Sequence, residues 1–199
     1  MYGSIAHYRV KPDKLDDLLA WGEAAERDDP GSGAMIVYQM DRDPNELFIA
    51  IVAESEAAYR ATSESPEMHE RYLQMLDYLA SEPEWNDGHI IASEFNLPDG
   101  GGLYGTISRQ WIKPGKFNEL SAWNEANPGP QDAPGAMLVY QMDRDPNEVF
   151  VVIVAESEAA YRAMSESPDM YERYLEMVEY LDGEPEWHDG HVLAARVSL

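Results

Sequence analysis

The chain has 199 residues, of which 44% are hydrophobic, and its 38 acidic side chains outnumber 14 basic ones for a formal net charge of −24. The hydrophobic share is enough for a packed core, which argues against a disordered chain. No apolar run reaches the ~18 residues that a membrane span needs. So acidic a surface repels phosphate backbones and anionic membranes, so we expect neither nucleic acid nor a membrane as a partner. An acidic surface ordinarily keeps a protein soluble, including in a cell with high internal salt, where the repulsion is screened. The alternative is a basic partner or a cationic ligand.

Two absences narrow the function further. There are no cysteines, which excludes disulfides, thiolate catalysis and cysteine-ligated metal sites. The stretch from Met1 to Ile5 enters strand-like sequence without the charged and apolar segments of a signal peptide, so a cytoplasmic protein is expected.

The chain is a tandem duplication. A shift of 102 positions aligns the chain with itself without a gap, and well over half of the aligned residues are identical; Val37–Glu46 returns unchanged as Val139–Glu148. A period this long marks a domain-sized repeat rather than a solenoid unit. We therefore predict a first repeat over residues 1–97, a glycine-rich linker over 98–102 and a second repeat over 103–199.

Each repeat shows the order β-α-β-β-α-β. Loops are expected at Asp28–Gly33 and Glu82–Gly88, and Ser55 and Ser65 are the expected N-caps of two helices. This order is the ferredoxin-like split βαβ motif, an α+β fold with the helices on one face of the sheet. In the first repeat we predict strand Tyr2–Val10, a helix from its cap Asp13 to Glu26, strands Ala34–Met40 and Leu47–Ala53, helix Glu56–Ser63, a helix starting at Pro66, and strand His89–Phe95.

The strand Leu47–Ala53 is apolar on both of its faces, since successive side chains alternate and both sets are hydrophobic. Helices cover only one face, and a bare second face would exceed the few hundred Å² of apolar patch that monomers tolerate. We expect the sheet of the other repeat to cover it. The predicted fold is thus two tandem ferredoxin-like βαββαβ units that pair sheet to sheet as an intramolecular dimeric α+β barrel, with further homodimerisation left open.

Each repeat resembles the antibiotic biosynthesis monooxygenase-type domain of the dimeric α+β barrel superfamily. The resemblance covers nearly all of both repeats and rests on the strand ending Val10-Lys11-Pro12, the strand carrying Tyr38, the segment Glu54–Tyr59, the helix start Ser65-Pro66 and the segment Pro83-Glu84-Trp85. It implies two paired sheets, with a pocket between each sheet and its helices. Some members oxidise polycyclic phenols with O₂ and no cofactor, relatives degrade haem, and many have no known activity.

Two positions depart from the pattern of the catalytic members. Those members tend to carry an asparagine in the first strand, and neither Tyr2–Val10 nor Tyr104–Ile112 contains one. A histidine often stands shortly before the Ser-Pro pair, where this chain has Thr62 and Met164.

The candidate catalytic residues recur in both repeats. His89 and His191 each follow an Asp-Gly pair, and an imidazole can act as a general base near neutral pH. The alternative is a structural role at the strand end. Tyr38 and Tyr140 are equal candidates for the group that deprotonates a phenol.

Ligand contacts are expected from aromatic and basic side chains, although most such aromatics belong to ordinary cores. The repeats differ in their first strands, which indicates either an asymmetric site or drift after duplication. The predicted substrate-binding residues are His7, Arg9, Arg109, Trp111, Trp85 and Trp187.

No metal site is predicted. The segment starting at Asp41 begins like a calcium-binding loop but lacks its glycine and final glutamate, and Asp87 with His89 provides too few ligands for zinc. Three functions stay open: a cofactor-independent monooxygenase-like enzyme acting on a small aromatic or phenolic compound, a non-catalytic small-molecule-binding or stress-type barrel, and haem binding or degradation. Haem is the cofactor only in the third.

Overall fold

The computed structural model describes residues 1–28, 33–98, 100–129 and 134–198. Residues 29–32 of the expected first loop and Asp99 of the expected linker therefore lie outside the described residues. Within the described ranges, no helix is long and apolar enough to cross a membrane. The chain forms two compact units, one of residues 1–89 and 193–199 and the other of residues 90–192.

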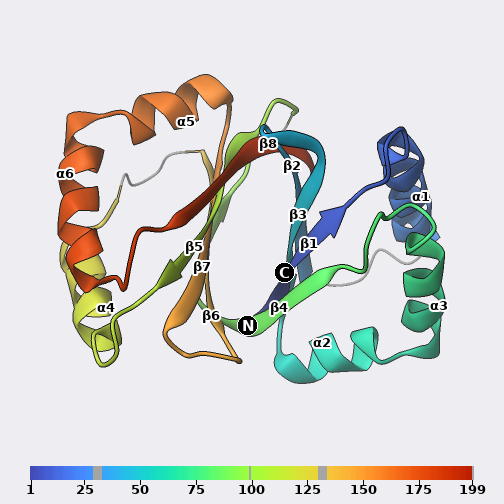
Figure 1. Ribbon diagram of the computed structural model, residues 1–199, viewed down its shortest axis with the longest axis horizontal. Helices are drawn as coiled ribbons and strands as arrows, with labels where there is room; N and C mark the ends of the chain where they lie inside the picture. Colours follow the sequence, from blue (N-terminus) through green and yellow to red (C-terminus); the bar gives the residue numbers. More distant parts are fainter. Residues whose placement is uncertain (29–32, 99, 130–133, 199) are drawn as a thin grey trace. The chain divides into compact units, whose positions relative to one another are not determined.

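The predicted order of elements is confirmed in both repeats, with the second helical segment divided in two (Figure 1). The first repeat contains β1 (Tyr2–Arg9), α1 (Leu15–Asp28), β2 (Gly33–Met40), β3 (Asp43–Ala53), α2 (Glu56–Ser63), α3 (Pro66–Met75) and β4 (Glu84–Asn96). The second contains β5 (Tyr104–Trp111), α4 (Phe117–Ala126), β6 (Gly135–Met142), β7 (Glu148–Ala155), α5 (Glu158–Ser165), α6 (Pro168–Met177), the 3₁₀ turn η1 (Val178–Tyr180) and β8 (Glu186–Ser198).

The strands of each unit are antiparallel. In the first unit β1 pairs with β3 and β4, and β2 pairs with β3; in the second unit β5 pairs with β7 and β8, and β6 pairs with β7. Helices α1 to α3 lie on one face of the first sheet, and α4 to α6 on one face of the second (Figure 1). The α+β class with two tandem ferredoxin-like repeats is confirmed.

Sequence signals at the helix starts are mostly confirmed. The side-chain oxygen of Ser55 accepts a hydrogen bond from the backbone nitrogen of Ala58, and that of Ser65 accepts one from Met68, so both serines cap their helices as expected. Pro66 occupies the first turn of α3, where no backbone donor is needed.

The first helix begins differently from the prediction. α1 starts at Leu15, and Asp13 sits before it with φ 62°. The aligned residue of the second repeat is Gly115, with φ 79°. The position therefore requires a left-handed backbone, which glycine adopts freely and aspartate tolerates better than most residues. Asp13 is a turn residue rather than an N-cap.

The predicted loop Glu82–Gly88 is also wrong over most of its length, because β4 already begins at Glu84. Asp87 and Gly88 pair with Ser4 and Gly3 of β1. The turn-forming residues suggested a loop, but partners on β1 satisfy their backbone groups. This early start places the Asp-Gly-His segment within the sheet.

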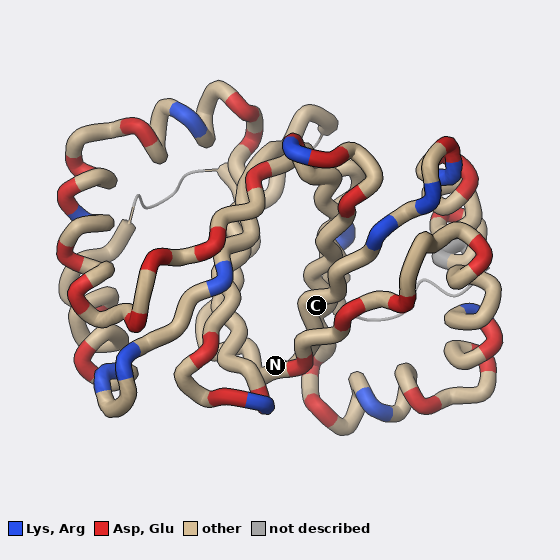
Figure 2. Tube along the Cα trace, viewed as in Figure 1, with Lys and Arg blue, Asp and Glu red and all other residues tan. Residues whose placement is uncertain are grey.

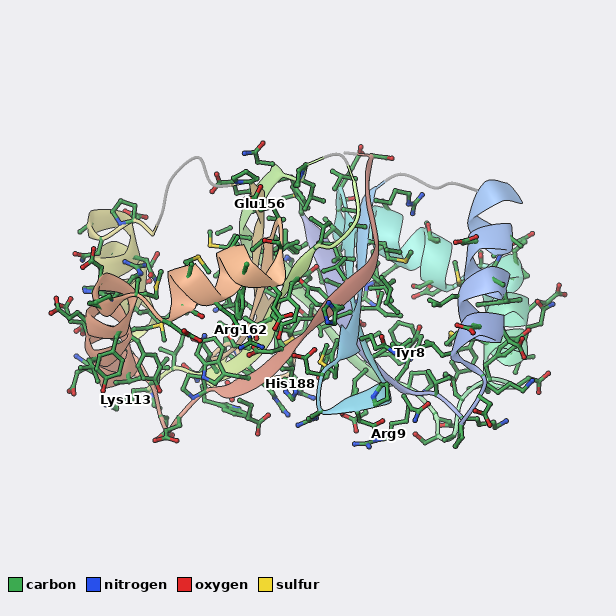
Figure 3. The ribbon with its side chains drawn as sticks, turned by 90° about the horizontal axis from the view of Figure 1, so that it is seen from above. Tyr8, Arg9, Lys113, Glu156, Arg162 and His188 are labelled. Carbon is green, nitrogen blue, oxygen red and sulfur yellow. The ribbon has the colours of Figure 1, made fainter. Side chains whose placement is uncertain are left out.

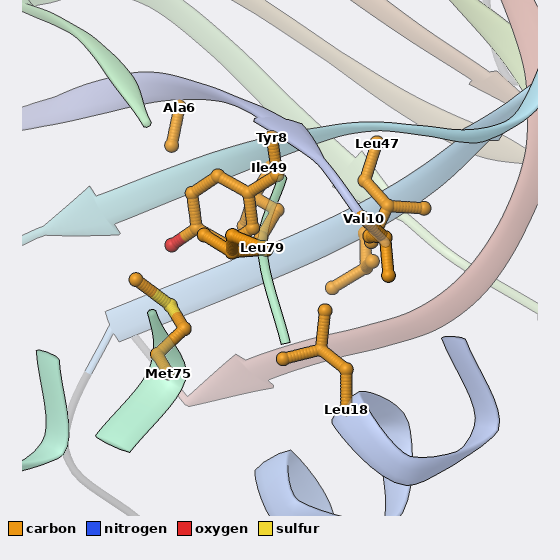
Figure 4. Packing of buried hydrophobic residues seen from close by; sticks show 9 residues of the cluster. Ala6, Tyr8, Val10, Leu18, Leu47, Ile49, Met75 and Leu79 are labelled. Carbon is orange, nitrogen blue, oxygen red and sulfur yellow. The ribbon is translucent and has the colours of Figure 1, made fainter. Parts of the chain in front are cut away.

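The hydrophobic layer between sheet and helices is the core of the first unit. Tyr8 lies in its middle, surrounded by side chains from three strands and from the helical segments (Figure 4). The corresponding cluster in the second unit is smaller and consists of Ile112, Leu120, Val149 and Leu181. The first cluster comprises Ala6, Tyr8, Val10, Leu18, Val37, Leu47, Ile49, Met75 and Leu79.

Candidate functional site

The strand register decides which side chains share a face. On β1, Ala6 and Tyr8 belong to the cluster with Met75, so they face the helices; Tyr2 and Ser4 share that face because side chains alternate along a strand. Asp87 and His89 pair with Ser4 and Tyr2 and therefore face the helices as well. We call this face of each unit its helix side.

A cluster of aromatic and polar groups occupies the helix side of the first unit. The ring of Tyr2, which is fully buried, meets those of Tyr59 and His89 edge-on, with centroids 5.2 Å away in each case. The Tyr59 hydroxyl donates to Oδ1 of Asp87 at 3.0 Å, and Nη2 of Arg60 donates to the Tyr2 hydroxyl at 3.4 Å. Through Tyr59 and Arg60, the cluster ties α2 to the sheet.

The second unit repeats this cluster. The Tyr104 ring lies 5.3 Å from that of Tyr161 and 5.1 Å from that of His191. The hydroxyl of Tyr161 donates to Oδ1 of Asp189 at 3.0 Å. Arg162 reaches from α5 toward the strands and donates to the Tyr104 hydroxyl at 3.4 Å (Figure 3). Duplication has preserved the partners and the distances.

The tyrosines that bind the aspartates are held in the neutral form. Burial, followed by the charge of Asp87, raises the pKa of Tyr59 to about 12. Burial and Asp189 likewise raise the pKa of Tyr161. Neither phenol can serve as a base near neutral pH. The exposed imidazoles of His89 and His191 are the groups of this cluster that can accept a proton from a ligand.

A second polar cluster lies on the opposite face of the first unit. Glu46 is only 2% exposed, and its carboxylate receives hydrogen bonds of 2.7 Å from Arg42 and from Nε2 of His7. Nη2 of Arg9 lies 3.8 Å from the same carboxylate. The hydrogen bonds from Arg42, assisted by His7, lower the pKa of Glu46 to about 2 despite its burial. The imidazole of His7 also stacks on Phe48, 4.4 Å between centroids.

The second unit keeps the carboxylate and changes one donor. Glu148 is 2% exposed and accepts hydrogen bonds from Arg144 and, at 2.6 Å, from Nε of Arg109. Burial raises the pKa of Glu148, but the bonds from Arg144 and Arg109 outweigh it and lower the pKa overall. The guanidinium of Arg109 also lies over the ring of Trp111, 4.7 Å from its centroid. His7 and Arg109 thus make equivalent contacts in the two repeats.

The predicted site residues fall on two different faces. Trp85 and His89 lie on the helix side of the first unit, as Trp187 and His191 do in the second, because they pair with residues of that face. Tyr38 pairs with Phe48, which also pairs with His7, so Tyr38 shares the face of the carboxylate cluster. The other predicted site residues on that face are Arg9 in the first unit and Tyr140, Arg109 and Trp111 in the second.

Sequence reasoning missed the buried carboxylates and the tyrosine–aspartate pairs. Glu46 follows the polar segment that starts at Asp41, and no local signal marks it as buried, whereas the structure buries it. Tyr59 and Asp87 are 28 positions apart, and only the fold shows that they touch. A usable signal was their joint recurrence as Tyr161 and Asp189. Among the described residues, no group of three or more His, Asp or Glu side chains is placed to hold a metal ion.

Comparison with known proteins identifies the fold. No family model matches the chain, and no curated protein matches its sequence. Solved structures match it over nearly their full lengths. A candidate monooxygenase of Fusobacterium nucleatum superposes with a TM-score of 0.83 at 10% identity, covering 98% of this chain and 94% of that one. The chain has the dimeric α+β barrel fold.

Two further structures show the range of proteins that share this fold. An anthrone oxidase-like protein matches with a TM-score of 0.67 at 15% identity, covering 99% of this chain and 93% of that one. A haem-degrading enzyme of Listeria monocytogenes matches with a TM-score of 0.57 at 8% identity, covering 96% and 99%. At these identities the similarity establishes the fold alone, and the chemistry must be argued from the site.

Proposed function

We propose that this protein binds a small phenolic compound on the helix side of a repeat and oxidises it with O₂, without a cofactor. The observation that carries the proposal is the exposed imidazole of His89 or His191, which lies edge-on to a buried tyrosine beside a tyrosine–aspartate hydrogen bond. A monooxygenase-like fold shared with an anthrone oxidase-like protein supports it.

The chemistry requires one proton acceptor and a site with little water. The imidazole removes the phenolic proton, and the electron-rich phenolate transfers an electron to O₂. In a substrate whose phenol is conjugated with a CH₂ group between two aryl rings, that carbon takes one oxygen atom and becomes a carbonyl. The other oxygen atom leaves as water with the two hydrogens of the CH₂ group, so no external reductant is needed.

The test is oxygen uptake with a panel of hydroquinones and aryl-flanked CH₂ phenols. General-base catalysis contributes about 10²–10⁴-fold to a rate, so His89→Asn or His191→Asn should reduce uptake by at least tenfold. His69→Asn is the matched control, because His69 is exposed on α3 and absent from the second repeat. Uptake that both site variants leave unchanged contradicts the proposal.

Two alternatives have their own outcomes. Binding without oxygen uptake across the panel favours a non-catalytic binding or stress-type protein. Haem binding is supported by the shared fold with a haem-degrading enzyme, and it predicts a shifted Soret band on haemin titration that disappears in His89→Ala or His191→Ala.

We propose in addition that the two repeats pair sheet to sheet within one chain. Both faces of β3 carry apolar side chains, with Leu47 and Ile49 on the helix side and Ala50 and Val52 on the other. Residues 1–97 and 103–199, expressed separately, should self-associate or fail to fold, and mixing them should restore a discrete complex. A well-folded monomer of either repeat contradicts the pairing.

The acidic surface has a separate proposed role in solubility at high salt. Asp and Glu are spread along the helices of both units (Figure 2), and repulsion among exposed charges weakens as salt screens it. The melting temperature should therefore rise between low and molar KCl, measured at fixed pH by circular dichroism. An unchanged melting temperature contradicts the high-salt interpretation.

A further inference from the structure

The helix-side layers of the two units differ in the size of their side chains. In the first unit the Tyr8 ring fills the centre of the layer, packed against Met75 and Leu79 (Figure 4), and meets the ring of Trp85 at 5.9 Å between centroids. Two positions of the second layer carry a larger side chain, Phe117 for Leu15 and Ile112 for Val10. Four positions carry a smaller one: Gln110 for Tyr8, Val149 for Leu47, Val151 for Ile49 and Val178 for Leu76.

The smaller side chains leave the second layer open to solvent. Val37, Ile49 and Met75 are 7%, 8% and 7% exposed in the first unit. Their counterparts Val139, Val151 and Met177 are only half-buried. Met137, which is aligned with the half-buried Met35, is 39% exposed.

A buried polar pair stands where the first unit has the tyrosine ring. Gln110 is 5% exposed, and its Nε2 donates to Oγ of Ser108 at 2.9 Å. Within the described parts of the chain, no side chain donates to the amide oxygen of Gln110. Trp187, no longer packed against a tyrosine at this position, lies 6.4 Å from the ring of Tyr174.

These features suit a ligand better than a core. Covering half-exposed apolar side chains stabilises a complex, and polar atoms that a ligand removes from water are normally hydrogen-bonded. A flat apolar molecule with a hydroxyl group satisfies both conditions, because its ring covers the valines and its hydroxyl donates to the glutamine oxygen. Small-molecule sites combine apolar walls with a few such polar groups.

We propose that the second unit alone carries a site for a flat aromatic compound with a hydroxyl group, in which Gln110 determines specificity by accepting the hydrogen bond of that hydroxyl. Gln110 stands six positions along β5 from Tyr104, the partner of His191, which is about 20 Å in a strand. A small ligand held by Gln110 therefore does not reach the imidazole, and the site is separate from that of the proposed oxidation. In the first unit the ring of Tyr8 fills the corresponding position.

The test uses the full chain and two fluorescent probes of similar shape, 2-naphthol and 2-methoxynaphthalene. The wild type should bind one 2-naphthol per chain, several-fold to tenfold more tightly than the ether, which lacks a hydroxyl donor. Gln110→Met, which has similar length and no acceptor oxygen, should bind both probes equally. Gln110→Tyr should abolish binding, whereas Tyr8→Phe, the matched control, should keep the wild-type stoichiometry and preference.

Three outcomes overturn the inference: two equivalent sites per chain, no binding of either probe, or a preference for 2-naphthol that survives Gln110→Met. Failure of the proposed function looks different, because selective binding at one site with no oxygen uptake leaves the inference standing and removes the oxidation. Oxygen uptake should persist in Gln110→Tyr, and its loss in a folded variant contradicts the separation of the two sites. Thermal melting of each variant shows whether it is folded.

Discussion

The two repeats agree in one polar cluster, differ by one donor in another, and diverge in the packing of a third region. The tyrosine–aspartate pair is the same in both, at 3.0 Å each time. The buried glutamate is kept while its partner changes from His7 to Arg109. At the centre of the helix side, the first repeat has Tyr8 and the second has Gln110 at the aligned position. The hydrogen bonds that attach α2 and α5 to their sheets are thus the same in both repeats. The hydrophobic layer between sheet and helices, by contrast, differs between them.

The largest difference is expected from truncating the centre of the two layers. Tyr8→Ala removes a buried ring, which for large core side chains costs about 3–5 kcal/mol of unfolding free energy. Gln110→Ala removes a smaller side chain from an already open layer and should cost about 1 kcal/mol. Urea unfolding monitored by tryptophan fluorescence measures both. Equal losses would show that the two layers are packed alike.

The buried glutamates give a prediction about pH. Removing the charge in Glu46→Gln weakens hydrogen bonds to charged groups, each typically worth about 1.5–3 kcal/mol. The pKa of Glu46 in the folded protein is lowered to about 2, so its contribution to stability is complete above the unfolded pKa, about 4.3, and is lost as the pH falls toward 2.

Unfolding free energies measured in urea at pH 7, 4 and 3 test this directly. The wild type should lose stability over that range, and Glu46→Gln should lose less. Glu148→Gln is the parallel variant in the second repeat and should behave in the same sense, because its pKa is also lowered. A pH dependence identical in wild type and both variants contradicts the assignment.

The smallest expected difference lies between the tyrosine–aspartate pairs. Tyr59→Phe and Tyr161→Phe each remove one hydrogen bond, worth about 0.5–1.5 kcal/mol, and the two losses should be equal. The pKa of Tyr59 is raised to about 12, so the stability it provides below the unfolded pKa of about 10 is lost as the pH rises toward 12. Ultraviolet titration of the phenolate, with Asp87→Asn as the comparison, should show the Tyr59 pKa falling when the charge is removed.

The sequence predicted the fold well because the signals were local or repeated. Serine caps at Ser55 and Ser65 depend on residues three positions away, and the duplication showed that each half repeats the same elements. The turn signals failed at Glu84–Gly88, where pairing with β1 overrode them.

The site was predicted only in part, because long-range packing determines it. His89 and Trp85 were identified as candidates from recurrence, and the fold places them on one face. Tyr38 was chosen on the same grounds and lies on the other face. Recurrence indicates that a residue matters, but the parity of its position on a paired strand decides what it can touch. The burial of Glu46 has no counterpart in local sequence.

The division of the chain into units has a consequence for folding. Residues 193–198, at the end of β8, group with the first unit although they belong to the second repeat. Contacts between segments so distant in the sequence require a long loop to close, so this part of the first unit is expected to form late in folding. Deleting Leu193–Ser198 would therefore destabilise the first unit, although these residues belong to the other repeat.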